Sequence, residues 1–207
     1  MSASQQEMRA VMGHFATGVC VISARRPDGS PVATTVNAVS SVSLRPPLLL
    51  VCLAHDSHTL AALRGGARFA VNVLAAHQRE HSIRFAAKGE HAKAHEVQFG
   101  EHELEVPYLP GALATIACRV SQIHPAGDHV IVIGEALASS SAERALAPLL
   151  FFRGSYSQLA HARPAAHLAA PVGAPAPPAS AQVGPERASE RSRAPTRRRL
   201  AVLERIG

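Results

Sequence analysis

The sequence predicts a mainly β fold, an antiparallel barrel with a few short helices. About seven segments have strand-like patterns, and only two or three short segments have helical spacing. Strands do not alternate with long helices, which argues against a doubly wound parallel sheet. The 207 residues, 47% of them hydrophobic, are enough for one domain with a sizeable aliphatic core.

The first predicted elements are a helix and a hairpin. Apolar side chains recur with helical spacing over Ser4–Phe15, which predicts a helix capped by its first residue and weakened at Gly13. Gly18–Ser23 then has strand character, and Arg26–Gly29 has the composition of a tight turn. With Pro31–Asn37 as the returning strand, these segments predict a β-hairpin.

The middle and end of the body supply the remaining elements. Pro46 and Pro47 mark the entrance to a continuous apolar run, which predicts a buried central strand over Leu48–Leu53. A short helix capped at Ser57 should stop at the glycine pair that follows Arg64. The other predicted elements are a strand over Arg68–Leu74, a helix over His77–Ala87, and strands over Leu113–Ile123, His129–Ser139 and Leu149–Arg153.

Composition divides the chain into a body, residues 1–159, and a tail, residues 160–207. The tail holds 7 Pro, 13 Ala, 8 Arg and no aromatic residue, so it cannot bury enough apolar surface to offset its ordering entropy. We expect disorder over Ala160–Arg197. Arg198–Ile206 has the pattern of a short helix, either a solvated end or a docking segment for a partner.

The net charge of +6 belongs mostly to this tail. The body carries 13 Lys and Arg against 12 Asp and Glu, whereas the tail carries 8 Arg against 3 Glu. A nearly neutral body has no electrostatic basis for gripping a phosphate backbone, so we expect no nucleic-acid partner. The alternative is a nucleic-acid-associated or scaffold role carried by the tail alone.

Cysteine usage and the N-terminus bear on the compartment. Cys20, Cys52 and Cys118 each lie in an apolar run without metal-type spacing, which is typical of buried small hydrophobic residues. The N-terminal residues lack the basic patch and apolar segment of an export signal, and no apolar run approaches the ~18 residues of a membrane span. We expect a reducing cytoplasm and no membrane partner.

The region Val32–Thr59 is the most informative about function, because two clusters of small polar residues flank one apolar strand. Ordinary turns between strands have the same composition. The alternative is a ligand site, since short side chains leave hydroxyls and main-chain N–H groups available to a flat ligand and to a phosphate. The first cluster holds Thr35, Asn37, Ser40, Ser41 and Ser43, and the second holds Ser57 and Thr59.

The order of residues in this region, T-x-N-x-x-S-S-V-S-x-x-P-P-L, resembles the flavin reductase family nearly position for position. Further blocks similar to the family's follow in its order over roughly residues 7 to 158. The resemblance implies a split barrel of the FMN-binding type. These blocks are GHFATGVCVISA from Gly13, FAVNVLAAHQ from Phe69, RFA from Arg84, GALATIACRV from Gly111, GDHVIVIGEA from Gly127 and PLLFFRGSY from Pro148.

The resemblance also implies which residues hold the flavin. The phosphate would lie at the predicted helix start, where hydroxyls and free amides attract an anion. The implied residues are Thr35, Asn37, Ala38, Val39, Ser40 and Ser41 for the ring and ribityl chain, Cys52 beside them, and Ser57, His58 and Thr59 for the phosphate.

A further family segment, with Arg84, Phe85 and Lys88, is implied to close over the flavin. The alternative is one core phenylalanine and two surface cations. Where many relatives continue with D-[RK]-F, this chain has GEHAKAH over residues 89–95, which leaves the contacts of this loop open.

The nicotinamide side is implied to involve two further places. His129, within G-D-H, is the expected catalytic residue, because an imidazole near the ring can orient the amide or steady developing charge. Phe152, Arg153 and Gly154 would lie beside the nicotinamide nucleotide, with Arg153 meeting its pyrophosphate. A structural histidine and a plain surface arginine are the alternatives.

Two histidine pairs have the i, i+4 spacing of metal ligands, His77 with His81 and His91 with His95. Neither pair lies in an H-E-x-x-H frame or has a third ligand. We therefore expect solvated helix faces and no metal.

The function that the resemblance implies is an NAD(P)H-dependent flavin reductase. It would take hydride from NADH or NADPH to FMN or FAD and act as a homodimer, the small component of a two-component monooxygenase. The flavin would perform the redox chemistry, and the protein would supply the slot. The alternative is a module that holds flavin tightly for electron transfer or redox sensing and does not release it.

Overall fold

The computed structural model describes residues 3–87, 94–143 and 146–159. The described elements belong to a unit of Met1–Ala166, while the second unit, His167–Gly207, lies outside the described residues. The predictions for the tail, disorder and a terminal helix, therefore stay predictions. The predicted boundary after Leu159 also remains untested.

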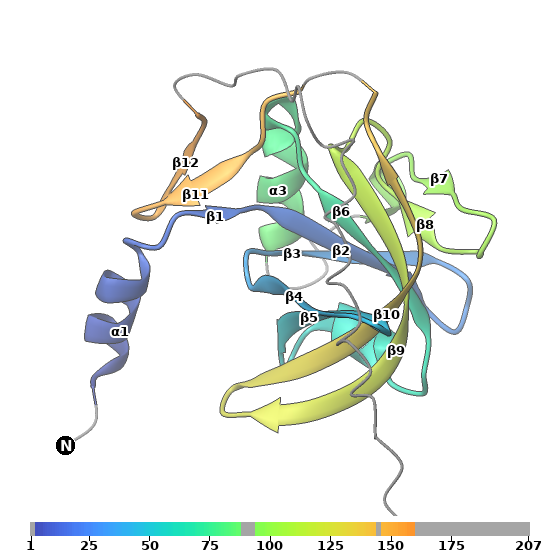
Figure 1. Cartoon of the computed structure of the whole chain (residues 1–207), viewed down its shortest axis with the longest axis horizontal. Coiled ribbons are helices and arrows are strands. Elements are labelled where there is room, and N and C mark those ends of the chain that lie inside the picture. The colour runs from blue at the N-terminus through green and yellow to red at the C-terminus, as the bar shows by residue number, and fades with distance from the viewer. Residues whose placement is uncertain (1–2, 88–93, 144–145, 160–207) are drawn as a thin grey trace, which may run out of the picture. The chain divides into compact units, whose positions relative to one another are not determined.

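A seven-stranded antiparallel sheet forms the body (Figure 1). Its spatial order is β3-β2-β6-β9-β10-β5-β4, so the two edge strands, β3 and β4, are consecutive in the chain. The sheet must curl to bring these edges back together at the Asn37–Ala38 connection, where it stays open. The strands are β2 (Cys20–Arg25), β3 (Pro31–Val36), β4 (Val39–Leu44), β5 (Pro47–Ala54), β6 (Arg68–Val73), β9 (Ala114–Ala126) and β10 (His129–Ser141).

Short helices and two small sheets complete the fold. The predicted class, mainly antiparallel β with a few short helices in a split-barrel arrangement, is confirmed. The helices are α1 (Gln5–Met12), α2 (His58–Leu63) and α3 (Arg79–Ala86), with 3-10 turns at Ala76–Gln78 and Ala94–Glu96. The small sheets are β1 (Thr17–Gly18) with β11 (Leu150–Phe152) and β12 (Ser155–Ser157), and β7 (Gly100–Glu101) with β8 (Pro107–Tyr108).

The core lies inside the curl of the sheet. Leu49, Val51 and Leu53 alternate inward along β5 and meet Phe69 of β6, which is fully buried. Phe69 explains a glycine across the sheet, because a Cβ added at Gly134 would lie 2.6 Å from the Phe69 ring. This close approach allows one large ring to fill the middle of the barrel.

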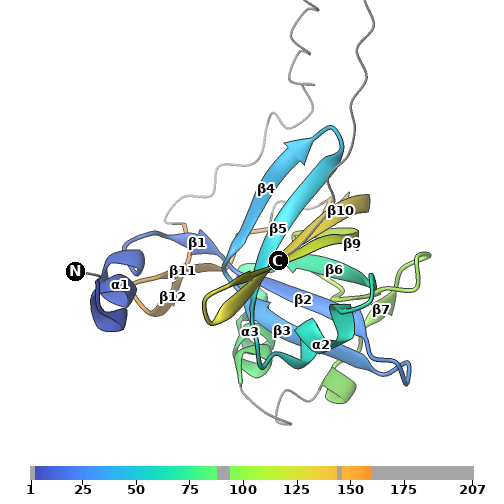
Figure 2. The ribbon, with the colours of Figure 1, turned by 90° about the horizontal axis from the view of Figure 1, so that it is seen from below.

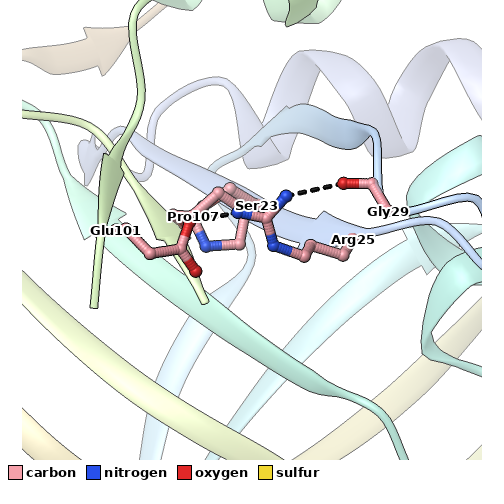
Figure 3. Close-up of polar contacts among 5 residues, drawn as sticks. All are labelled: Ser23, Arg25, Gly29, Glu101 and Pro107. Carbon is pink, nitrogen blue, oxygen red and sulfur yellow. Dashed lines mark hydrogen bonds and ion pairs between the residues drawn. The ribbon is translucent and has the colours of Figure 1, made fainter. Parts of the chain in front are cut away.

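A buried polar network joins β2 and β6 to the β7–β8 ribbon. The Asn72 amide donates to the Val21 carbonyl and to Ser23 Oγ, both at 2.9 Å, and its oxygen accepts from the Leu109 N–H at 2.8 Å. Ser23 Oγ in turn donates to the Pro107 carbonyl (Figure 3). Every polar atom of these two side chains thus has a partner, which lets both side chains lie fully buried.

Several boundaries and one strand differ from the sequence prediction. Helix α1 ends at Met12, not Phe15, because Gly13 caps it. The run Val39–Leu44 is strand β4, although its serines had suggested a turn or a ligand cluster. Strand β5 lies next to the sheet edge rather than at its centre, and its burial alternates instead of being continuous.

The N-terminal arm, defined here as α1, β1, β11 and β12, extends from one side of the body (Figure 2). Ser4 caps α1 in a capping box with Glu7, as the sequence predicted for the cap. No residue of α1 is buried. The Arg153 N–H donates to the Gly13 carbonyl at 2.8 Å, which ties the helix end to the β11–β12 turn.

None of the helices in the described part of the chain is long and apolar enough to cross a membrane.

Candidate functional site

The main cavity, about 490 Å³, opens where the sheet fails to close. Strand β3 forms one wall, the end of β5 forms the other, and the first turn of α2 and the end of α3 border it. Its volume lies within the roughly 300–1,000 Å³ of small-ligand sites. The split in the barrel therefore provides a concave site built from both sheet edges.

Nine of the residues singled out from the sequence line this cavity. They come from segments far apart in the chain: the β3–β4 connection, the end of β5, α2, α3 and the β9–β10 turn. The nine residues are Thr35, Asn37, Ala38, Cys52, Ser57, His58, Thr59, Phe85 and His129.

The first turn of α2 presents hydroxyl groups to the cavity. Ser57 caps the helix, and its Oγ accepts from the Leu60 N–H at 3.4 Å. Thr59 is 1% exposed, and its Oγ1 has no hydrogen-bond partner within the described residues. A buried hydroxyl without a partner costs free energy unless something bonds to it. The hydroxyl of Thr59 thus has hydrogen-bonding capacity to offer a ligand.

Thr35 and Cys52 line the middle of the cavity with different roles. Thr35 Oγ1 donates to the Ser82 carbonyl at 2.8 Å, so this hydroxyl joins β3 to α3. The Cys52 N–H donates to the Ala38 carbonyl at 3.0 Å, which holds the β3–β4 connection against β5. Partial burial raises the pKa of the Cys52 thiol, so it lines the site as a neutral group at neutral pH.

His129 lies at the start of β10, directly after the tight turn that contains Gly127. Its Nδ1 is 2.8 Å from Asp128 Oδ1, and the hydrogen bond to His129 lowers the pKa of the Asp128 carboxyl. Because a carboxylate only accepts, Nδ1 carries the hydrogen in this contact, and Nε2 is left for a ligand. His55 holds the turn through its main-chain N–H to the Asp128 carbonyl at 3.3 Å and through Nε2 to the Gly127 carbonyl at 3.2 Å.

The other singled-out residues do not line the cavity. Ser40 and Ser41 are exposed on the edge strand β4, and Val39 packs toward the core. Arg84 points instead to Glu96, with Nη1 2.6 Å from Oε2. Lys88 lies outside the described residues.

The predicted nicotinamide segment Phe152–Gly154 forms the β11–β12 turn of the N-terminal arm. Arg153 has a positive φ of 50°, and its guanidinium lies 5.3 Å from the centre of the Phe152 ring. These residues line neither of the two cavities described here. Within a single chain, the predicted site is thus divided between the cavity and the arm.

A second, smaller cavity of about 190 Å³ adjoins the first. The two share Thr35, Val36, Asn37 and Ala86. Phe151 and Tyr156 of the arm form its outer wall, and the Tyr156 hydroxyl lies 2.8 Å from Ser82 Oγ. The base of the arm thus borders the same wall as the main cavity.

Sequence reasoning missed Arg26, Asp56 and the alanines after Phe85, all of which line the main cavity. Arg26 had been interpreted only as part of a turn. The sequence holds no local signal for it, because Arg26 lies in the turn after β2 and reaches the cavity only in the folded chain.

The described residues do not bring together three or more metal-ligating side chains in one group. His81 is half-buried against Phe85, and burial together with Arg84 lowers its pKa. His91 lies outside the described residues.

The chain is thus a mainly antiparallel split-barrel protein with a cavity of small-ligand size at the open edge of its sheet. Residues 12–160 match the sequence profile of the flavin reductase like domain, so the chain belongs to this family. The family assignment made from the sequence is therefore confirmed.

Individual relatives agree with this assignment. The chain is 38% identical over 151 residues to the "Flavin-dependent monooxygenase, reductase subunit HsaB" of Mycobacterium tuberculosis, covering 72% of this chain and 79% of that protein. It is 37% identical over 155 residues to "FMN reductase (NADH) SmoA" of Agrobacterium fabrum, covering 75% and 86%. The solved structure of the flavin reductase PheA2 superposes with a TM-score of 0.70 at 39% identity, covering 77% of this chain and all of that chain.

The residues of the cavity fit a phosphorylated flavin. The buried Thr59 hydroxyl, without a partner among the described residues, suits a phosphate oxygen, and the volume suits a ligand with a tricyclic ring. The apolar groups of the lining, among them Phe85, Ala86 and Ala38, suit the flat faces of that ring.

Proposed function

We propose that this protein is an NAD(P)H-dependent flavin reductase that takes hydride from a reduced nicotinamide to FMN or FAD. The observation that carries the proposal is the convergence of nine sequence-predicted residues on one cavity at the barrel split. Membership of the flavin reductase like family supports it, as does the similarity to an NADH-dependent FMN reductase.

In this proposal the chain's own residues bind and orient, while the flavin, when bound, supplies the redox chemistry. Ser57, His58 and Thr59 hold the phosphate, and Asn37 and Ala38 face the ring and ribityl chain. His129, with Nδ1 fixed by Asp128, presents Nε2 to the nicotinamide amide. An oriented imidazole costs no reorganisation when charge develops near it.

The same proposal includes a partner enzyme, a flavin-dependent monooxygenase that consumes the reduced flavin. The relative from Mycobacterium tuberculosis is named as a reductase subunit of such a monooxygenase. Three free cysteines, two of them buried, accord with a reducing cytoplasm as the working compartment.

We also propose that the protein works as a homodimer that joins the arm of one copy to the cavity of the other. Helix α1 has eight residues, fewer than the ~12–15 at which an isolated helix becomes marginally stable, and its apolar side chains are solvent-exposed in one chain. A second copy would cover Val11 and Phe15, which are 68% and 66% exposed. In such a dimer, the Phe152–Gly154 turn of one copy would lie at the cavity of the other copy. Within one chain, this turn lines neither described cavity.

Steady-state turnover tests the activity. Purified protein should oxidise NADH or NADPH continuously when FMN, FAD or riboflavin is supplied in excess. Turnover limited to one equivalent of tightly bound flavin would favour the alternative of a flavin-holding redox module. Absence of both turnover and bound flavin absorbance would refute the proposal.

A further inference from the structure

Two neighbouring arginines at the end of β2 have different surroundings. Arg25 is the last residue of β2, and Arg26 begins the turn to β3. Their contacts differ, since Arg25 pairs with Glu101 of β7 while Arg26 lines the main cavity. One arginine therefore faces the β7–β8 ribbon, and the other faces the main cavity.

Arg25 is fully engaged on its own face, as Figure 3 shows. Its Nη1 donates to the Gly29 carbonyl at 2.6 Å, and its Nη2 forms an ion pair with Glu101 of β7. Ser23, two residues earlier, bonds to Pro107 on the same side. This face of β2 is thus occupied by structural contacts within the chain.

Arg26 is held more loosely and lines the cavity. Its Nη1 donates to Ser30 Oγ at 3.3 Å, which is long for a hydrogen bond. The Oγ and N–H of Ser30 donate to the nearby Asp28 carboxylate at 2.6 and 2.8 Å and lower its pKa, and the Arg26 charge lowers it further. The guanidinium of Arg26 therefore keeps donors available on the cavity side.

Arg26 contributes to the charge of the cavity lining. Among the described lining residues, and leaving the two histidines aside, the charged side chains are Arg26 and Asp56. Their formal charges cancel, so loss of Arg26 would leave a net negative charge beside the site. The buried Thr59 hydroxyl, which lacks a partner in the described part of the chain, lines the same cavity.

We infer that Arg26 is a specificity-determining residue that pairs with the phosphate of a phosphorylated flavin and so discriminates FMN and FAD against riboflavin. A guanidinium offers several N–H donors to a phosphate, and charge-assisted hydrogen bonds are stronger than neutral ones. In this inference Arg26 contacts the phosphate end of the flavin, which takes no part in hydride transfer. The inference rests on the proposed function.

The test compares binding of riboflavin, FMN and FAD to the full-length protein and to Arg26→Gln by quenching of flavin fluorescence. We expect Kd for FMN and FAD to rise about tenfold, the scale of a partly exposed charged hydrogen bond. Kd for riboflavin should stay within about twofold, because riboflavin has no phosphate. Arg26→Lys, which keeps the charge, should recover most of the loss.

Arg25→Gln is the matched control, since it removes a neighbouring positive charge that faces the ribbon. It should leave all three dissociation constants within about twofold of the wild type. Higher salt should weaken FMN binding to the wild type more than to Arg26→Gln, because salt screens the charge pair.

Several results separate the possible failures. Equal loss of riboflavin and FMN binding in Arg26→Gln would overturn the inference, because it would indicate a structural role. Unchanged FMN binding in that variant would overturn it as well. Failure of the wild type to bind any flavin would instead refute the proposed function itself.

Discussion

The cavity wall and the N-terminal arm both carry residues of the predicted cofactor site. The wall carries those assigned to the flavin and the arm those assigned to the nicotinamide nucleotide, and the two regions differ in how they are stabilised. The wall is built on buried packing: Phe85 is 1% exposed and Thr59 is held on a capped helix. At the other end of the arm, α1 and the residues just after it keep their apolar side chains in solvent, with Phe15 66% exposed. One chain therefore buries the wall of the cavity by itself, whereas α1 and Phe15 stay exposed, and the proposed homodimer would cover them.

The largest effect should separate the two regions by stability. Phe85→Ala empties a fully buried position, and it should lower the free energy of unfolding by about 3–4 kcal/mol. Phe15→Ala removes an exposed ring and should change the stability of the monomer by less than about 0.5 kcal/mol. Urea denaturation of both variants at low protein concentration measures the difference. Similar losses in both would contradict the comparison.

The next effect concerns chemistry at the cavity. His129→Ala should slow flavin reduction by NADH or NADPH by about 100-fold, the scale of a lost preorganised contact. The dissociation constant for FMN should remain within about twofold, since His129 is assigned to the nicotinamide. Stopped-flow absorbance measures the reduction rate. The control is His124→Ala, an exposed residue of β9 that bonds to Gln122 and does not line the cavity.

The arm should respond through assembly. Val11→Glu puts a charge on the exposed apolar face of α1 and should raise the dimer dissociation constant at least about tenfold, because a desolvated unpaired charge is costly. Sedimentation velocity measures the shift. The control is Arg9→Gln, on the same exposed helix but outside the capping box of Ser4 and Glu7. A wild type that stays monomeric at high concentration would refute the proposed dimer.

The smallest effect is a pH dependence at Cys52. Partial burial raises its pKa, so alkylation of the folded protein should become fast only at a higher pH than for a free cysteine. Cys20 and Cys118 should remain unreactive, because burial raises their pKa values to about 11 and about 12. Mass spectrometry after iodoacetamide treatment at several pH values measures each site. FMN should slow the labelling of Cys52, and labelling unaffected by FMN would place the flavin away from β5.

The sequence patterns predicted most of the fold because each element has a local signal. Ser57 before α2, the turn residues Arg26–Gly29 and the apolar run of β6 specify structure without reference to distant parts. Strand β4 was missed because Ser40, Ser41 and Ser43 suit a turn locally. Pairing with the apolar strand β5 makes them a strand, and that contact is not local.

The candidate site was predicted in part for the same reason. Asn37, Cys52, Ser57 and His129 meet because the sheet curls to bring its two edges together. Arg26 escaped notice because it lies in the turn after β2, and only the folded chain places that turn beside the cavity. Arg153 lines neither described cavity of its own chain, and only the proposed homodimer would bring it to one.

A crystal structure with FMN tests most directly whether the split of the barrel holds a flavin. We predict the phosphate against Thr59 and the first turn of α2, with the ring between Ala38, Cys52 and Phe85. FMN bound at any other surface, with the cavity between β3 and β5 left to solvent, would contradict the account.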